Sequence, residues 1–252
     1  MSEVAPAARL ACVEVDYPGR GRALGPIDFT VEAGEIVSLV GPSGCGKSTA
    51  LRLLAGLEAP GRGKVVRAAR RGETAVVFQS PTLAPWLSAA ANVALPLELA
   101  GTARPEARRR AEEALDAVGL GDAARARPAQ LSGGMAMRAS LARALVTAPR
   151  LLLLDEPFAA LDEITRRALA DDLLKIWARA RPAIVFVTHN VEEAAYMASR
   201  VVVMSAGPGR ILGEVGVPGD LPRPQGFRTS APFRDAAEAI SHRLADGAGG
   251  RP

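Results

Sequence analysis

Residues 35–49 have the sequence EIVSLVGPSGCGKST, and this segment is the clearest indicator of the fold class. Its first six residues form a short apolar run rich in β-branched side chains and closed by glycine, which predicts a buried strand. A helix is expected over residues 49–57, where leucines recur at helical spacing. The segment between them is a complete Walker A pattern, made of Gly41, Pro42, Ser43, Gly44, Cys45, Gly46, Lys47, Ser48 and Thr49.

This glycine-rich loop has the residues expected of a site that binds a nucleoside triphosphate. Its glycines let backbone N–H groups curl around phosphates, and the N-terminus of the following helix adds a positive dipole end. We expect Lys47 to reach the β- and γ-phosphates and the Ser48 hydroxyl to ligate Mg²⁺. The alternative is a tight turn that binds nothing, but the spacing, the Lys-Ser pair and the strand-loop-helix setting all favour ATP and Mg²⁺ as cofactors.

Two further apolar runs, residues 151–154 and 184–187, also predict buried strands. Such strands alternating with helices are typical of an α/β fold with a parallel sheet covered on both faces, whose ligands bind at the carboxyl ends of the strands. Between residues 79 and 131 the pattern changes to helix-like segments, notably 105–118, interrupted by prolines. We interpret this region as a helical insertion.

The strand at 151–154 ends in Asp155 and Glu156, which would supply the second half of the nucleotide site. Asp155 is expected to hold Mg²⁺ through water, and Glu156 to orient and deprotonate the attacking water. A purely structural role is the alternative, but unpaired charges at the edge of a core are costly.

The residues Leu131-Ser132-Gly133-Gly134-Met135 resemble the signature sequence of ABC ATPases, and they precede the Asp155 strand by a short helix, as in that family. Alone, the pentapeptide could be a helix N-cap, and both interpretations can hold together. The resemblance covers about residues 10–215. It implies a P-loop NTPase core with a mostly parallel sheet, an antiparallel β lobe and an inserted helical subdomain. It also implies that Ser132, Gly133 and Gly134 contact the γ-phosphate bound by an opposite subunit.

Other positions match this family one by one. Tyr17 matches the aromatic residue that stacks on adenine, and Gln79 matches the glutamine that senses Mg²⁺ and the attacking water. His189 matches the histidine that contacts the γ-phosphate. Ala160-Leu161-Asp162 matches the loop that crosses the dimer interface, so Asp162 would help to couple the two sites.

The resemblance also predicts how the chain is organised. Residues 1–252 would form a single ABC ATPase domain, in which about 10–80 and 146–215 make the core with its β lobe, about 81–145 the helical subdomain, and about 216–252 a C-terminal tail. Three departures from the family pattern stand out: Met135 replaces the commoner glutamine, Asn190 replaces an aspartate, and the segment 63–75 is a few residues shorter than usual.

The segment 78–88, FQSPTLAPWLS, resembles the subfamily that energises importers of nitrate, sulfonate, taurine and related solutes. There it lines the groove that receives the permease, so Pro85-Trp86 would be a rigid apolar docking element. The alternative is a proline-capped loop with a buried tryptophan. The tail residues 221–224 also fit the subfamily.

The resemblance implies a second ABC ATPase subunit, forming a homodimer, a transmembrane permease and, indirectly, a periplasmic or extracellular solute-binding protein. The alternatives are an export or lipid-transport ATPase and a soluble ATPase that acts on nucleic acid. Nucleic acid is not expected, because the arginines behind the net charge of +4 are scattered among acidic residues.

No apolar run approaches the roughly 20 residues that cross a bilayer, and the first residues lack the layout of a signal peptide. We therefore expect the protein to stay in the cytoplasm, and the family resemblance implies a peripheral position at the cytoplasmic face of the inner membrane. The two cysteines, Cys12 and Cys45, are too few for a disulfide framework, so reduced thiols and no structural zinc are expected. Cys45 lies beside a helix N-terminus and Lys47, which predicts a lowered thiol pKa.

Overall fold

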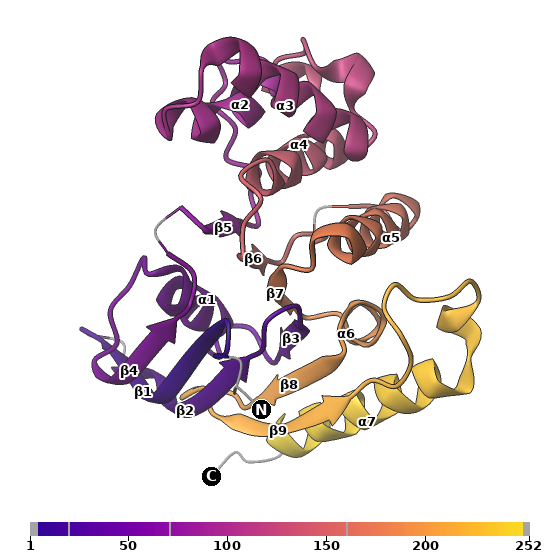
Figure 1. Cartoon of the computed structure of the whole chain (residues 1–252). Coiled ribbons are helices and arrows are strands. Elements are labelled where there is room, and N and C mark those ends of the chain that lie inside the picture. The colour runs from indigo at the N-terminus through magenta and orange to yellow at the C-terminus, as the bar shows by residue number, and fades with distance from the viewer. Residues whose placement is uncertain (1–4, 20, 71, 160, 249–252) are drawn as a thin grey trace.

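The computed structural model describes residues 5–19, 21–70, 72–159 and 161–248, and its main feature is a six-stranded sheet (Figure 1). The strands lie in the order β5 (Thr74–Val77), β6 (Leu151–Asp155), β7 (Ala183–Thr188), β3 (Ile36–Val40), β8 (Arg200–Met204) and β9 (Ile211–Gly216). All neighbours are parallel except β8 and β9. The strands expected at 35–40, 151–154 and 184–187 are confirmed, and they occupy the middle of the sheet, where both faces are covered.

A separate antiparallel sheet is formed by β2 (Gly21–Val31), β1 (Ala8–Tyr17) and β4 (Arg62–Arg67), in that order. It packs over one face of the six-stranded sheet together with α1 (Lys47–Ala55), and the two share one hydrophobic cluster. The antiparallel β lobe is thus confirmed, even though the segment after β4 is short.

Alternate residues of the central strands face two different hydrophobic clusters. Val37 and Leu39 of β3 point to the β lobe and α1, whereas Ile36 and Val40 point to the opposite face. This alternation follows from the period of two in a strand. The opposite face is covered by α5 (Glu163–Ala180), α6 (Val191–Met197) and α7 (Ala231–Ala248), with the short 3₁₀ turn η3 (Phe227–Thr229) before α7.

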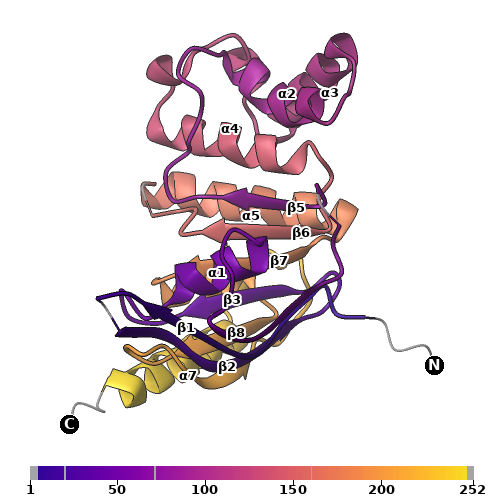
Figure 2. The same cartoon turned by 90° about the vertical axis from the view of Figure 1, so that its left-hand side faces the viewer.

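The helical insertion is confirmed as α2 (Ala89–Leu99), α3 (Arg104–Ala117) and α4 (Gly133–Leu145), with 3₁₀ turns η1 (Gly121–Ala123) and η2 (Pro128–Gln130) between α3 and α4. The three helices share a third hydrophobic cluster. Figures 1 and 2 show them together at one end of the molecule, beyond β5. Among the described residues, every helix is too short or too polar to span a bilayer.

Candidate functional site

The turn between β3 and α1 holds the Walker A residues in a curled loop. Gly46 is the N-cap of α1 with φ of 96°. A Cβ there would lie 2.8 Å from Leu24 Cδ1, and a Cβ on Gly41 would lie 2.8 Å from the Cys45 sulfur. Left-handed backbone and close approach both favour glycine at position 46, and close approach alone favours it at position 41. The loop therefore presents bare backbone at the start of a helix, as a phosphate site requires.

The loop borders a pocket of about 1090 Å³ at the carboxyl edge of the sheet. Its lining contains Tyr17, Pro18, Arg22, Ala23, Ser43, Gly44, Cys45, Gly46, Lys47, Ser48, Thr49, Arg52, Glu58, Glu156, Gly207 and Pro208. Lys47 is nearly buried, and its ammonium donates to the carbonyl oxygens of Gly41, at 2.7 Å, and Pro42, at 2.9 Å. The loop thereby fixes one positive charge against its own backbone.

Two carboxylates stand at the end of β6. The Ser48 hydroxyl donates to Asp155 Oδ1 at 2.9 Å, which joins the phosphate loop to this strand. Burial raises the pKa of Asp155, and the neighbouring Glu156 raises it further, while the hydrogen bond from Ser48 opposes the rise. Glu156 has φ of 46°, and its backbone N–H donates to the Val187 carbonyl at 3.0 Å. Such left-handed backbone is costly outside glycine and is concentrated at functional sites.

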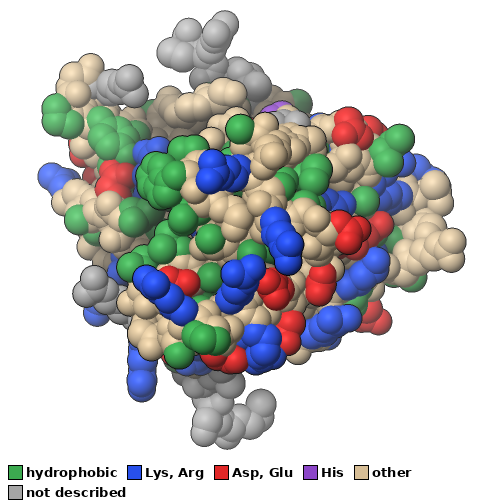
Figure 3. Space-filling model, turned by 90° about the horizontal axis from the view of Figure 1, so that it is seen from above, with side chains coloured by type: hydrophobic (Ala, Val, Ile, Leu, Met, Phe, Trp, Pro, Cys, Tyr) green, Lys and Arg blue, Asp and Glu red, His purple; other side chains and the backbone are tan. Residues whose placement is uncertain are grey.

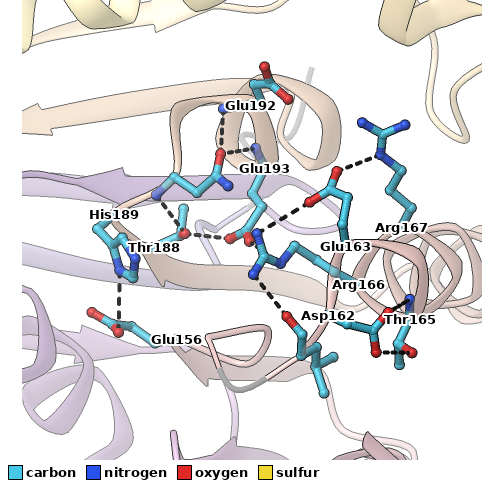
Figure 4. Close-up of polar contacts among 12 residues, drawn as sticks. Glu156, Asp162, Glu163, Thr165, Arg166, Arg167, Thr188, His189, Glu192 and Glu193 are labelled. Carbon is cyan, nitrogen blue, oxygen red and sulfur yellow. Dashed lines mark hydrogen bonds and ion pairs between the residues drawn. The ribbon is translucent and has the colours of Figure 1, made fainter.

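Glu156 is also where the ends of β5 and β7 meet β6. Gln79 Nε2 donates to Glu156 Oε2 at 3.4 Å. His189 Nδ1 lies 3.4 Å from the same oxygen (Figure 4). The His189 side chain is 64% exposed. Asn190, the departure from the family pattern, caps α6 by accepting from two backbone N–H groups. Three strand ends thus bring together three of the side chains expected to act on the phosphates.

Tyr17 ends β1 and also lines the pocket. Its hydroxyl lies 3.3 Å from the Thr49 Oγ1 atom, so the ring stands beside the first turn of α1. The β lobe therefore contributes an aromatic side chain to one wall of the pocket.

The signature residues and Asp162 do not line this pocket. Ser132 is the N-cap of α4 and accepts from Met135 N–H at 3.2 Å, so its expected capping role is confirmed. Asp162 caps α5 in the same way, and its bonds from Thr165 lower the pKa of its carboxyl. The first turns of α4 and α5 lie close together at Gly134, since a Cβ there would lie 3.1 Å from Thr165 Cγ2.

A Cβ on Gly133, in contrast, would meet no atom of the other described elements within 4 Å. Ala160, which belongs to the same predicted interface loop as Asp162, lies outside the described residues.

The predicted lowering of the Cys45 thiol pKa is wrong. Cys45 is fully buried in the cluster shared with the β lobe, and burial raises its pKa more strongly than the nearby Lys47 lowers it. The sequence placed the thiol near positive charge, but the loop turns it inward, where the thiolate is poorly solvated. Both cysteines are free.

The alternative of a buried tryptophan in segment 78–88 is also wrong, because Trp86 is 72% exposed. Its loop is fixed instead by the fully buried Asn92, which accepts from Ala84 N–H at 2.7 Å and donates to the carbonyls of Ala84, Leu87 and Ser88.

Sequence reasoning missed several residues of the pocket. Arg22, Arg52 and Glu58 all line it, and Arg22 pairs with Glu14 at 2.8 Å and Asp16 at 3.2 Å. No motif marks these charged residues, because surface side chains of β2, of α1 and of the turn after α1 show no pattern that distinguishes a pocket wall from a solvated face.

Known proteins have sequences similar to that of this chain. The family model described as ABC transporter matches residues 24–159. A taurine import ATP-binding protein of Chromobacterium violaceum is 47% identical over 206 residues, 79% of each chain. A nitrate import ATP-binding protein of Synechococcus elongatus is 42% identical over 226 residues, 84% of this chain and 81% of that one.

Among solved structures, a dimeric post-hydrolysis state of an ATP-binding cassette bound to ADP and Pi superposes with a TM-score of 0.76 and 32% identity. The superposition covers 84% of this chain and all of that one.

Proposed function

The chain belongs to the ABC transporter family and is an ATPase, and we propose that it dimerises around ATP to drive uptake of a small solute through a separate permease. One observation carries the chemical part of this proposal. The phosphate loop, the Ser48–Asp155 hydrogen bond and the Glu156 carboxylate converge at one edge of the sheet. That edge is where ligands of open α/β sheets bind.

We propose that Lys47 and the backbone of residues 41–49 hold the phosphates, and that Tyr17 stacks on the adenine. Mg²⁺ would be held by Ser48, Gln79 and Asp155. These residues fit the ion, because hydroxyl, amide and carboxylate oxygens are its preferred ligands and two of them already lie 2.9 Å apart. When bound, Mg²⁺ neutralises charge that develops on the phosphates.

Glu156 is proposed as the general base that orients and deprotonates water. Its contacts with Gln79 and His189 support this role, because both side chains would approach the γ-phosphate together with it. The strained backbone of Glu156 is consistent with a side chain that must point in one direction.

The second ATPase subunit is proposed to complete the site. Ser132, Gly133 and Gly134 stand at the start of a helix and are absent from the pocket lining of their own chain, so the positive end of this helix would serve the γ-phosphate of a partner copy. The open space around Gly133 supports this, since no contact among the described residues requires glycine there. Asp162 would lie in the same interface.

We propose that the helical subdomain formed by α2, α3 and α4 contacts the permease. Trp86 and Leu99 are 72% and 80% exposed, and exposed tryptophan is enriched in protein interfaces. Figure 3, seen onto this end, shows apolar side chains mostly towards its left side, with some charged ones among them, whereas charged side chains predominate towards the lower and right sides. A peripheral position at the cytoplasmic face of the membrane follows, with a solute-binding protein acting through the permease on taurine-, sulfonate- or nitrate-type solutes.

The proposal is tested by Glu156→Gln. This change should preserve ATP affinity and lower turnover by about 10²–10⁴, the usual contribution of a general base. The ATP-bound dimer should accumulate, as seen by size-exclusion chromatography with ATP and Mg²⁺. Hydrolysis at the wild-type rate without a dimer would contradict the assignment of Glu156.

A further inference from the structure

A chain of polar contacts joins two loops of the site that are far apart in sequence. Arg166 Nη2 donates to the Leu161 carbonyl at 2.9 Å, and Arg166 Nε lies 3.3 Å from Glu193 Oε1. The Thr188 hydroxyl donates to Glu193 Oε2 and accepts from Asn190 N–H at 3.0 Å. Figure 4 shows Glu193 between Arg166 on α5 and Thr188 at the end of β7. The backbone before Asp162 is thereby connected to the backbone on both sides of His189.

The central carboxylate of this chain is costly to bury and therefore depends on its partners. The Glu193 side chain is only 10% exposed, and burial raises its pKa, while Thr188, Arg166 and His189 oppose the rise. The contact with Arg166 is an ion pair, since its Nε is not aligned for a hydrogen bond. Removing one member of such a buried pair leaves the other poorly compensated, so the two residues behave as a unit.

Neither residue reaches the pocket. Arg166 and Glu193 are absent from its lining, and among the described residues their polar contacts are with each other, the Leu161 carbonyl, Thr188, Glu163 and the Asn190 cap. An arginine that binds the carbonyl of an interface loop can transmit a displacement of that loop to the carboxylate it pairs with. The carboxylate in turn holds the hydroxyl that precedes His189.

We propose that Glu193 and Arg166 are positioning residues that couple His189 to the loop at Leu161 and Asp162, so that dimer contacts at that loop set the place of the histidine. This inference rests on the proposed function, because it uses the roles assigned there to His189 and Asp162. It adds a route within one chain by which closure of the interface prepares hydrolysis.

The test compares Glu193→Gln with Arg166→Gln and the double variant, using the full-length chain, ATP and Mg²⁺. Glutamine at 193 keeps the acceptor for Thr188 and removes only the charge. We expect kcat to fall about 3- to 30-fold, the usual range for residues that modulate coupling, with the KM for ATP within about twofold. The double variant should be no slower than the slower single variant, because the pair acts as a unit.

The matched control is Asp172→Asn. Asp172 also lies on α5 and pairs with an arginine, Arg138, at 2.9 Å, and that arginine likewise binds a loop carbonyl, that of Val118. Its loss should lower the melting temperature and leave kcat within about twofold of wild type, as for partly exposed sites away from the chemistry.

Equal kcat in Glu193→Gln, Arg166→Gln and Asp172→Asn would overturn the inference, as would additive losses in the double variant. If the variants at 193 or 166 do not fold, Thr188→Val breaks the same chain at another contact and should give the same fall in kcat at unchanged KM. A wild-type kcat there would overturn the inference. Wild-type turnover in Glu156→Gln would instead overturn the proposed site, so the two failures are distinguishable.

Discussion

Gly133→Ala distinguishes the effect of this glycine on the stability of its own chain from its effect on the ATPase activity of the dimer. Gly133 is the first residue of α4, its φ is not in the left-handed region, and a Cβ would meet no atom within 4 Å in the part of the chain that the structure describes. Alanine at such a position stabilises by about 0.4–1 kcal/mol, because the unfolded chain loses freedom. For a chain of this size we expect the melting temperature to rise by about 1–4 °C.

Activity should change in the opposite direction. If the start of α4 approaches a nucleotide held by the partner, the added methyl group enters a packed contact, and overpacking costs about 1–3 kcal/mol. That corresponds to a loss of turnover of about 5- to 150-fold. The neighbouring Gly134→Ala should show no gain in stability, because its Cβ would lie 3.1 Å from Thr165 Cγ2 within the chain.

The assay combines thermal unfolding by circular dichroism without nucleotide, ATPase turnover, and dimer formation with ATP in a Glu156→Gln background. Gly216→Ala is the control, since a Cβ there also meets no described atom within 4 Å, but Gly216 lies on the edge strand β9 and is not part of the pocket lining. A Gly133→Ala chain that is more stable and as active as wild type would refute the trans role of the signature. A less stable Gly133→Ala chain would show that a Cβ at this position is not free of contacts within its own chain.

Three other outcomes are expected. In a Cys12→Ser background, maleimide should label Cys45 slowly at pH 7 and faster as the pH rises, because burial raises the pKa of its thiol. Bound ATP should protect Cys45 from the reagent. Labelling at pH 7 as fast as that of an exposed thiol would contradict the raised pKa. Trp86→Ala should leave the turnover of the isolated chain unchanged but weaken binding to the cognate permease by about 30-fold or more, measured by co-purification from membranes. Mixed Lys47→Ala and Ser132→Arg chains should regain ATPase above both parents, with mass spectrometry confirming heterodimers; near-normal activity of a wild-type heterodimer with one Ser132→Arg chain would exclude a trans role for Ser132.

Much of the fold and of the candidate site could be predicted because its signals are local. The apolar runs that end at Val40 and Leu154 predict buried strands from side-chain period alone, and the strand-loop-helix setting of residues 35–49 fixes where the phosphate loop lies. The caps Ser132 and Asp162 are local as well, since each bonds a backbone N–H three residues on. These features depend on residues close together in the chain.

Contacts between residues distant in sequence are visible only in the tertiary structure. Cys45 is turned into the cluster under the β lobe, which reverses the direction of its pKa, and Trp86 is left exposed because Asn92 fixes its loop. Glu193 meets Arg166 only because α5 and α6 pack on the same face of the sheet. A sequence motif specifies which groups a segment carries, whereas burial, solvation and pairing depend on contacts between segments, and these set the charge and direction of each group.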